Sequence, residues 1–146
     1  MYSVAELMST GLETLPASAT IQQAMALMSE KHIRHIPVVD DKGRLQGLVS
    51  HRDLLAASGP RLGENKEAPA ADMPLLSDIM TEQVETVLKN TSLRVAAQIL
   101  VARKFGCLPV TDKQGKLVGI ITDSDFVNIA ANLLEQMEFQ EPDEDF

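Results

Sequence analysis

The sequence contains one cysteine, few aromatic residues and fewer basic than acidic residues. The single cysteine, Cys107, excludes an intrachain disulfide and fits a reducing compartment such as the cytoplasm. Tryptophan is absent and aromatic residues make up 3% of the chain, so a core must be built from aliphatic side chains and methionine. Hydrophobic residues still account for 45%, which is ordinary for a globular protein. We therefore expect a cytoplasmic globular protein.

Charge and hydropathy argue against two classes of partner. The chain has 21 acidic and 13 basic residues and a net charge of −8, which argues against nucleic acid or an anionic membrane as the main partner. No apolar run approaches the ~18–20 residues that span a bilayer, and the N-terminus lacks the pattern of a secretory signal. A small phosphate ligand stays open, because cations at a binding site act locally.

An internal repeat organises the 146 residues. Residues 4–58, shifted by 72 positions, align with residues 76–130 without a gap. Composition alone predicts roughly four identical pairs over that span. The sequence has eleven: Met8/Met80, Glu13/Glu85, Thr14/Thr86, Ala24/Ala96, Pro37/Pro109, Val38/Val110, Asp40/Asp112, Gly43/Gly115, Leu45/Leu117, Gly47/Gly119 and Asp53/Asp125.

Each copy has the same order of predicted elements, which makes a tandem βαββα repeat of the α/β (α+β) class. A short alternating strand comes first, followed by an amphipathic helix, two strands joined by a tight glycine turn, and a final helix. Methionines on the helical stripe, such as Met25 and Met28, are interpreted as core residues and not as ligand contacts. The predicted first strands are 12–15 and 84–87, the hairpins 36–50 and 108–122, and the final helices 53–57 and 125 to about 137.

The composition also predicts boundaries. Residues 1–58 form the first repeat and residues 75–137 the second. The segment 59–74, rich in glycine, proline, alanine and charge, is predicted to be a linker. Residues 138–146 are predicted to be a solvated acidic tail, with partner binding as the less favoured alternative.

A Ser/Thr-x-x-Asp motif ends the last strand of each copy, with Ser50 and Asp53 in the first and Thr122 and Asp125 in the second. The start of a helix favours anions, a hydroxyl can bond a phosphate oxygen, and a carboxylate can accept both hydroxyls of a ribose. A single such motif is usually an ordinary helix cap. Its duplication favours a binding function.

The chain resembles the cystathionine-β-synthase (CBS) domain pair, or Bateman module, over nearly its whole length. The resemblance rests on Met-Ser/Thr before the first strand, on Ile-Pro-Val-Val-Asp at 36–40 and Leu-Pro-Val-Thr-Asp at 108–112, and on both Ser/Thr-x-x-Asp motifs. The run 33–40 is also similar to stand-alone bacterial pairs of the acetoin-utilisation type.

The resemblance implies two repeats packed about a pseudo-two-fold axis, with an adenosine-ligand cleft on each side. The implied ligands are AMP, ADP, ATP, S-adenosylmethionine and relatives, with no obligatory cofactor. The Ile or Leu before proline would cover the adenine, the hydroxyl would bind phosphate and the aspartate would bind ribose. One site would combine Thr122 and Asp125 with Met8, Leu12, Glu13, Thr14, Ile33, Arg34, His35 and Ile36; the other would combine Ser50, His51, Arg52 and Asp53 with Met80, Val84, Glu85, Thr86, Phe105, Cys107 and Leu108.

The cations of the two implied sites come from different positions. Arg34 and His35 precede the first Pro-Val strand, where related modules place phosphate-binding cations, whereas His51 and Arg52 lie inside the Ser50 motif. Each site would then have one arginine and one histidine, and we expect both to accept a phosphorylated adenosine. The alternative is that Arg34 and His35 cap a helix and that His51 and Arg52 are solvated.

Two further chemistries are weaker interpretations. His32 and His35 are spaced like metal ligands, but no third ligand is predicted nearby, so no metal is expected. Cys107 lies near a histidine, yet it begins a predicted buried strand and lacks an orienting group, so burial explains it better than a nucleophilic role.

Three functions follow from the sequence. The first is a regulatory module, not an enzyme, that binds an adenosine nucleotide, forms a homodimer and alters an unknown partner protein. The second is an enzyme, which the absence of a P-loop or a nucleophile–base pair disfavours. The third is a structural interaction module with empty clefts. The candidate dimer face comprises Leu54, Leu55, Val127, Ile129 and Leu133.

Overall fold

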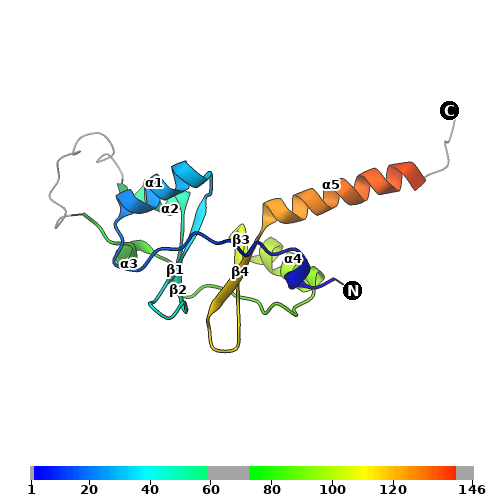
Figure 1. Ribbon diagram of the computed structural model, residues 1–146. Coiled ribbons are helices and arrows are strands. Elements are labelled where there is room, and N and C mark those ends of the chain that lie inside the picture. The colour runs from blue at the N-terminus through cyan, green and yellow to red at the C-terminus, as the bar shows by residue number, and fades with distance from the viewer. Residues whose placement is uncertain (1, 59–72, 141–146) are drawn as a thin grey trace.

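The computed structural model describes residues 2–58 and 73–140 and contains two copies of one helix-and-hairpin unit (Figure 1). The first copy comprises a 3-10 helix η1 (Val4–Glu6), α1 (Ile21–Lys31), β1 (His35–Val39), β2 (Leu45–Ser50) and α2 (His51–Ser58). The second comprises α3 (Leu76–Ile79), α4 (Leu93–Arg103), β3 (Cys107–Thr111), β4 (Leu117–Thr122) and α5 (Asp123–Gln140). None of the helices within the described residues has the length and apolarity to cross a bilayer.

The central helices α1 and α4 begin and end in equivalent ways. The Thr20 hydroxyl accepts the N–H of Gln23 at 3.1 Å, and the Gln23 side chain accepts the N–H of Thr20 at 2.8 Å. This reciprocal bonding confirms the capping box predicted from the sequence. Ser92 caps α4 through the N–H of Val95 at 3.2 Å. Both helices end on a residue with left-handed backbone, His32 (φ 56°) and Lys104 (φ 57°), which bonds the preceding turn.

The two hairpins confirm the predicted strands and turns. β1 pairs with β2, and β3 with β4, in antiparallel two-stranded sheets. Gly43 and Gly115 have φ of 80° and 84°, so each turn needs a residue that tolerates positive φ. Asp40 and Asp112 each accept two backbone N–H groups within their own turn, at 2.8–2.9 Å. These bonds fix where each hairpin reverses.

The two hairpin turns bond to each other. The N–H of Leu45 donates to the carbonyl of Gly115, and the N–H of Leu117 donates to the carbonyl of Gly43, both at 2.9 Å. A shift of 72 residues converts each of these two hydrogen bonds into the other. The pair of bonds joins the two repeats at one end of the sheets and supports the pseudo-two-fold arrangement.

The predicted first strands are reduced to single bridges. Leu15 bridges Val38, and Val87 bridges Val110, each in parallel. Leu15 bonds the strand with its N–H and its carbonyl, at 3.3 and 3.1 Å. Residues 12–14 form no bridge, so alternation alone overestimated this strand, and Pro16, which has no N–H, prevents pairing beyond Leu15.

The N-terminal segment of each sequence repeat packs on the other repeat. Val4 is fully buried in the core of the second repeat, and its N–H bonds the carbonyl of Thr91 at 2.8 Å. Leu76 is fully buried in the core of the first repeat, and its N–H bonds the carbonyl of Ala19 at 2.8 Å. Each packed unit therefore contains a segment from the other sequence repeat.

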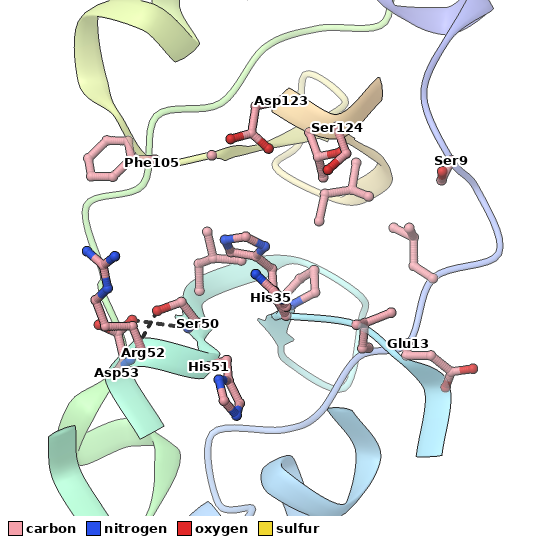
Figure 2. A pocket seen from close by; sticks show the side chains of 18 of the residues that line it. Ser9, Glu13, His35, Ser50, His51, Arg52, Asp53, Phe105, Asp123 and Ser124 are labelled. Carbon is pink, nitrogen blue, oxygen red and sulfur yellow. Dashed lines mark hydrogen bonds between the residues drawn. The ribbon is translucent and has the colours of Figure 1, made fainter. Parts of the chain in front are cut away.

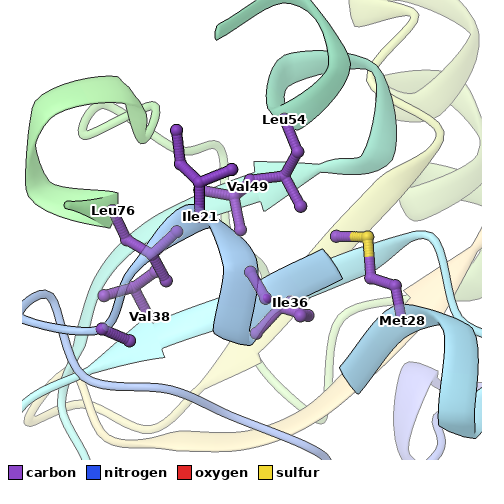
Figure 3. Close-up of a cluster of buried hydrophobic side chains, with 9 residues drawn as sticks. Ile21, Met28, Ile36, Val38, Val49, Leu54 and Leu76 are labelled. Carbon is purple, nitrogen blue, oxygen red and sulfur yellow. The ribbon is translucent and has the colours of Figure 1, made fainter. Parts of the chain in front are cut away.

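Two aliphatic cores result, as the lack of aromatic residues predicts. In the first, Met28 packs with Ile36 and Leu54 beneath α1 and α2 (Figure 3), which confirms that this methionine is a core residue. Leu54 has no exposed surface. It therefore cannot belong to a dimer face, which corrects that part of the prediction.

The last helix is longer than predicted and has no buried side chain. α5 ends at Gln140 and so includes residues 138–140, which were predicted to belong to the acidic tail. Its C-terminal half extends away from the two hairpins (Figure 1). Five large apolar side chains on it are exposed: Val127, Leu133, Leu134, Met137 and Phe139. Most of the predicted linker and the end of the predicted tail lie outside the described residues.

Candidate functional site

One cleft of about 1110 Å³ between the two repeats is lined by both Ser/Thr-x-x-Asp motifs. Its volume slightly exceeds the ~300–1,000 Å³ typical of a pocket for one small molecule. The sequence predicted a cleft on each side, and residues of both predicted sites line this space. The predicted site residues that line it are Glu13, Ile33, Arg34, His35, Ser50, His51, Arg52, Asp53, Phe105, Thr122 and Asp125, together with Leu12 and Val84.

Eight predicted site residues do not line this cleft: Met8, Thr14, Ile36, Met80, Glu85, Thr86, Cys107 and Leu108. Ile36 and Leu108 are fully buried in the two cores. A side chain without exposed surface cannot cover an adenine face, so this predicted role is corrected. Pro37, the next residue along β1, borders the cleft but is also buried. Glu85 lies in a side pocket of about 350 Å³, where Arg103 is 3.9 Å away.

Met8 and Met80 pack beneath the motifs. A Cβ placed on Gly119 would lie 2.5 Å from the sulfur of Met8, and one on Gly47 would lie 2.6 Å from the sulfur of Met80. Both distances are shorter than real contacts allow, so only glycine leaves room for the thioether. The glycine of each motif thus allows the N-terminal segment of one sequence repeat to pack against the strand of the other.

Both motifs form reciprocal helix caps. The N–H of Ser50 donates to Oδ2 of Asp53, and the N–H of Asp53 donates to Oγ of Ser50, both at 3.1 Å (Figure 2). Thr122 and Asp125 make the same pair of bonds at 2.9 and 3.3 Å. Each carboxylate has a second oxygen, and each hydroxyl a proton, that these bonds do not use. Capping and ligand binding are therefore compatible.

The start of α2 is surrounded by basic residues. His51 and Arg52 are its first two residues and both line the cleft. The N–H of His51 bonds the carbonyl of Arg34 at 2.8 Å, so the backbone of Arg34 lies at the same helix start. The guanidinium of Arg52 adds to the positive end of the helix dipole, and together they favour an anion.

The start of α5 carries an acidic residue where the start of α2 carries basic ones. Asp123 and Ser124 are its first two residues, and the N–H of Asp123 bonds the carbonyl of Gly106 at 3.1 Å. Oδ2 of Asp123 and Cε1 of His35 lie 3.3 and 3.8 Å from the position that a Cβ on Gly106 would take. The His35 side chain therefore reaches across from β1 to the second repeat, next to Asp123.

Burial lowers the pKa of His35 from its usual 6.5, although the carboxylates of Asp123 and Asp53 oppose that shift. The imidazole is therefore mainly neutral at neutral pH. Burial, followed by the charges of Asp123 and Asp125, raises the pKa of the Cys107 thiol to about 12. A protonated thiol with 1% exposure fits the structural interpretation of this cysteine.

The sequence reasoning missed further lining residues, several of which are counterparts under the 72-residue shift. Lys104 is the counterpart of His32, and both line the cleft after the left-handed end of a helix. Ser9 and Thr81 are counterparts too, and each exchanges two backbone hydrogen bonds with a central strand of the other repeat. The Met-Ser/Thr pair identified these residues as part of the repeat but not as part of the cleft.

Two pseudo-symmetric units with a shared cleft and paired Ser/Thr-x-x-Asp motifs define a tandem-repeat ligand-binding fold. The chain belongs to the CBS domain family, whose family model matches residues 4–59 and 76–132. A CBS domain-containing protein of Dictyostelium discoideum is 35% identical, over 90% of this chain and 93% of its own length. The resemblance inferred from the sequence is thereby confirmed, as is the fold class.

Solved structures agree with this family. A Vibrio cholerae protein named as an acetoin utilization protein, AcuB, is 41% identical with a TM-score of 0.81, over 94% of this chain and 98% of that chain. CBSX2 of Arabidopsis thaliana in complex with AMP is 33% identical with a TM-score of 0.78, over 91% and 98%. The CBS domain pair of protein MJ0100 in complex with 5′-methylthioadenosine and S-adenosyl-L-methionine is 25% identical with a TM-score of 0.73, over 87% and 98%.

Proposed function

We propose that this protein is a regulatory module that binds adenosine ligands in the cleft between its two CBS repeats and catalyses no reaction. One observation carries the proposal: both Ser/Thr-x-x-Asp motifs, each at a helix start, line one cleft whose other walls come from both repeats. AMP, 5′-methylthioadenosine and S-adenosylmethionine are bound by relatives of this fold. The composition favours a cytoplasmic location.

Each half of the cleft would use one motif and the base-contacting segment of the other repeat. Asp53 and Asp125 would accept the ribose hydroxyls through their unused carboxylate oxygens. In Figure 2, Phe105 lies on the same side of the cleft as Ser50 and Asp53. The first half would therefore be Ser50 and Asp53 with Val84 and Phe105 as apolar walls for the adenine.

The second half would be Thr122 and Asp125 with Leu12, Glu13 and Ile33. All five residues line the cleft. Ser9 and Glu13 lie on the other side of the view in Figure 2, away from Phe105. The proposal is therefore one adenosine ligand in each half.

Signalling would require that the ligand bind two arrangements of the protein with different affinity. The two repeats touch through hairpin turns and exchanged N-terminal segments, so their relative position is the element that a ligand in the cleft would change. A homodimer through the exposed apolar residues of α5 would transmit that change to a regulated protein.

A thermal-shift screen tests the proposal. AMP, ADP, ATP, S-adenosylmethionine, NADH and cyclic dinucleotides are each added to the full chain. A ligand at about 100 times its Kd should stabilise the fold by roughly 2.7 kcal/mol and raise the Tm by several degrees. If no adenosine ligand raises the Tm, the structural-module function replaces this one. Release of phosphate from ATP would instead favour an enzyme.

A further inference from the structure

The two helix starts in the cleft differ in charge at their first two positions and share an aspartate at the third. The first three residues are His51, Arg52 and Asp53 in α2, but Asp123, Ser124 and Asp125 in α5. With neutral histidine the formal charge is zero at the start of α2 and −2 at the start of α5. All six residues line the cleft. An anion beside α5 would therefore face an extra carboxylate and no arginine from its own helix.

The loops that bond the two helix starts also differ in sequence. The carbonyl of Arg34 accepts the first N–H of α2, whereas the equivalent carbonyl at α5 belongs to Gly106, which has no side chain. Lys104 also lines the cleft and directly precedes Phe105 in the sequence. The counterpart of Lys104 in the other repeat is His32. Glu13 adds a further carboxylate to the half with Thr122 and Asp125, 3.8 Å from Lys31.

His35 does not restore a positive charge beside α5. Its ring lies close to Asp123, but burial keeps it mainly neutral at neutral pH. The sequence reasoning assigned one arginine and one histidine to each site. The histidine of the second site is neutral and lies beside the carboxylate of Asp123.

We propose that the two halves of the cleft bind different adenosine ligands. The half with Ser50 and Asp53 binds a nucleoside 5′-phosphate, such as AMP. The half with Thr122 and Asp125 binds an adenosine derivative whose 5′ substituent carries no negative charge, such as a thioether or a sulfonium. Asp123 is the residue that excludes the phosphate. This inference rests on the proposed function and adds the ligand class of each half.

Calorimetric titration of the full chain with AMP and 5′-methylthioadenosine tests the inference without any variant. Saturation with AMP should leave one 5′-methylthioadenosine site per chain with nearly unchanged affinity. Complete displacement of one ligand by the other would overturn the inference. Absence of binding by every adenosine ligand would overturn the proposed function as well.

Two single substitutions, each of which removes the aspartate of one half of the cleft, show which half binds which ligand. Asp53→Asn leaves the half with Thr122 intact, and Asp125→Asn leaves the half with Ser50 intact. Asparagine retains helix-capping ability, so both variants are expected to fold. In Asp53→Asn, 5′-methylthioadenosine should bind about tenfold more tightly than AMP, and in Asp125→Asn the order should reverse. If Asp53→Asn binds AMP as tightly as 5′-methylthioadenosine, the inference is wrong while the proposed function stands.

The role of Asp123 is tested in the Asp53→Asn background. Adding Asp123→Asn should shift the affinity ratio toward AMP by about tenfold, because one like charge is removed from beside the phosphate. Asp41→Asn removes the same charge from an exposed turn outside the cleft and should leave the ratio unchanged. An equal effect of both substitutions, or no effect of Asp123→Asn, would show that Asp123 does not select the ligand.

Discussion

At the scale of single residues, small differences between equivalent positions decide what each half of the cleft can do. The Gly-h-h-Ser/Thr-x-x-Asp sequence, in which h is an apolar residue, is shared by both repeats, yet its glycine, its hydroxyl and its aspartate have separate tasks. The glycine leaves room for a methionine, while the hydroxyl and the aspartate cap a helix and keep polar atoms for a ligand.

Gly119→Ala should lower the free energy of unfolding by about 1–3 kcal/mol, because the added methyl group overlaps the thioether of Met8 and forces the buried segment to move. Gly11→Ala is the matched control. No atom lies within 4 Å of its Cβ position, so we expect a change within about 0.5 kcal/mol. Urea unfolding measures both. Equal stability of the two variants would contradict the packing described for Met8.

The pKa of His35, lowered by burial, makes stability depend on pH. The unfolded chain binds the proton near pH 6.5, whereas the folded chain binds it only at lower pH. The free energy of unfolding should therefore fall as pH decreases through 6.5 and level off below the folded pKa. His35→Gln should reduce the loss between about pH 7.5 and 5.5. Urea unfolding at both pH values provides the measurement, and an NMR pKa of His35 at or above 6.5 would contradict the account.

At the scale of elements, the sequence predicts the parts whose signals are local. Capping residues, the periodic helical stripe and the turn glycines indicated α1, α4 and both hairpins correctly. Three features were missed, two because they depend on contacts distant in sequence and the third because the end of α5 has no buried face. The first strands shrink to single bridges, α2 buries Leu54, and α5 continues to Gln140 without packing that periodicity would reveal.

The candidate site was predicted only in part, because local motifs can be found in the sequence whereas contacts between distant residues cannot. The motif residues and their cations line the cleft, because a motif at a strand end has a fixed position in the fold. Ile36 and Leu108 were assigned to the ligand, but both side chains are fully buried in the two cores. The meeting of His35 with Asp123 needed the three-dimensional arrangement of both repeats.

Substitutions at Thr122 test how much its hydroxyl, as a helix cap, contributes to the free energy of unfolding. Thr122→Ala removes the hydroxyl that accepts the N–H of Asp125 and should cost about 1 kcal/mol of unfolding free energy. Thr122→Ser retains that acceptor and should cost much less. Thermal and urea unfolding compare the two, and equal losses would show that the hydroxyl bond does not stabilise α5.

At the scale of the whole molecule, the exposed apolar residues of α5 are the proposed dimer face. Leu133→Glu should convert a dimer into a monomer in sedimentation velocity, because it places a charge where apolar side chains would meet. Asn128→Glu adds the same charge to an exposed polar position of α5 and serves as the control. Monomeric behaviour of the unmodified chain, or a Leu133→Glu dimer, would contradict the proposed assembly.

The central claim is that Asp53 and Asp125 hold adenosine ligands in the shared cleft. Calorimetric titration with AMP and with 5′-methylthioadenosine, on the unmodified chain and on the double variant Asp53→Asn/Asp125→Asn, tests it most directly. The unmodified chain should bind both ligands, and the folded double variant should lose at least tenfold in affinity for each, since charged hydrogen bonds to the ribose disappear. No binding by the unmodified chain, or undiminished binding by the double variant, would contradict it.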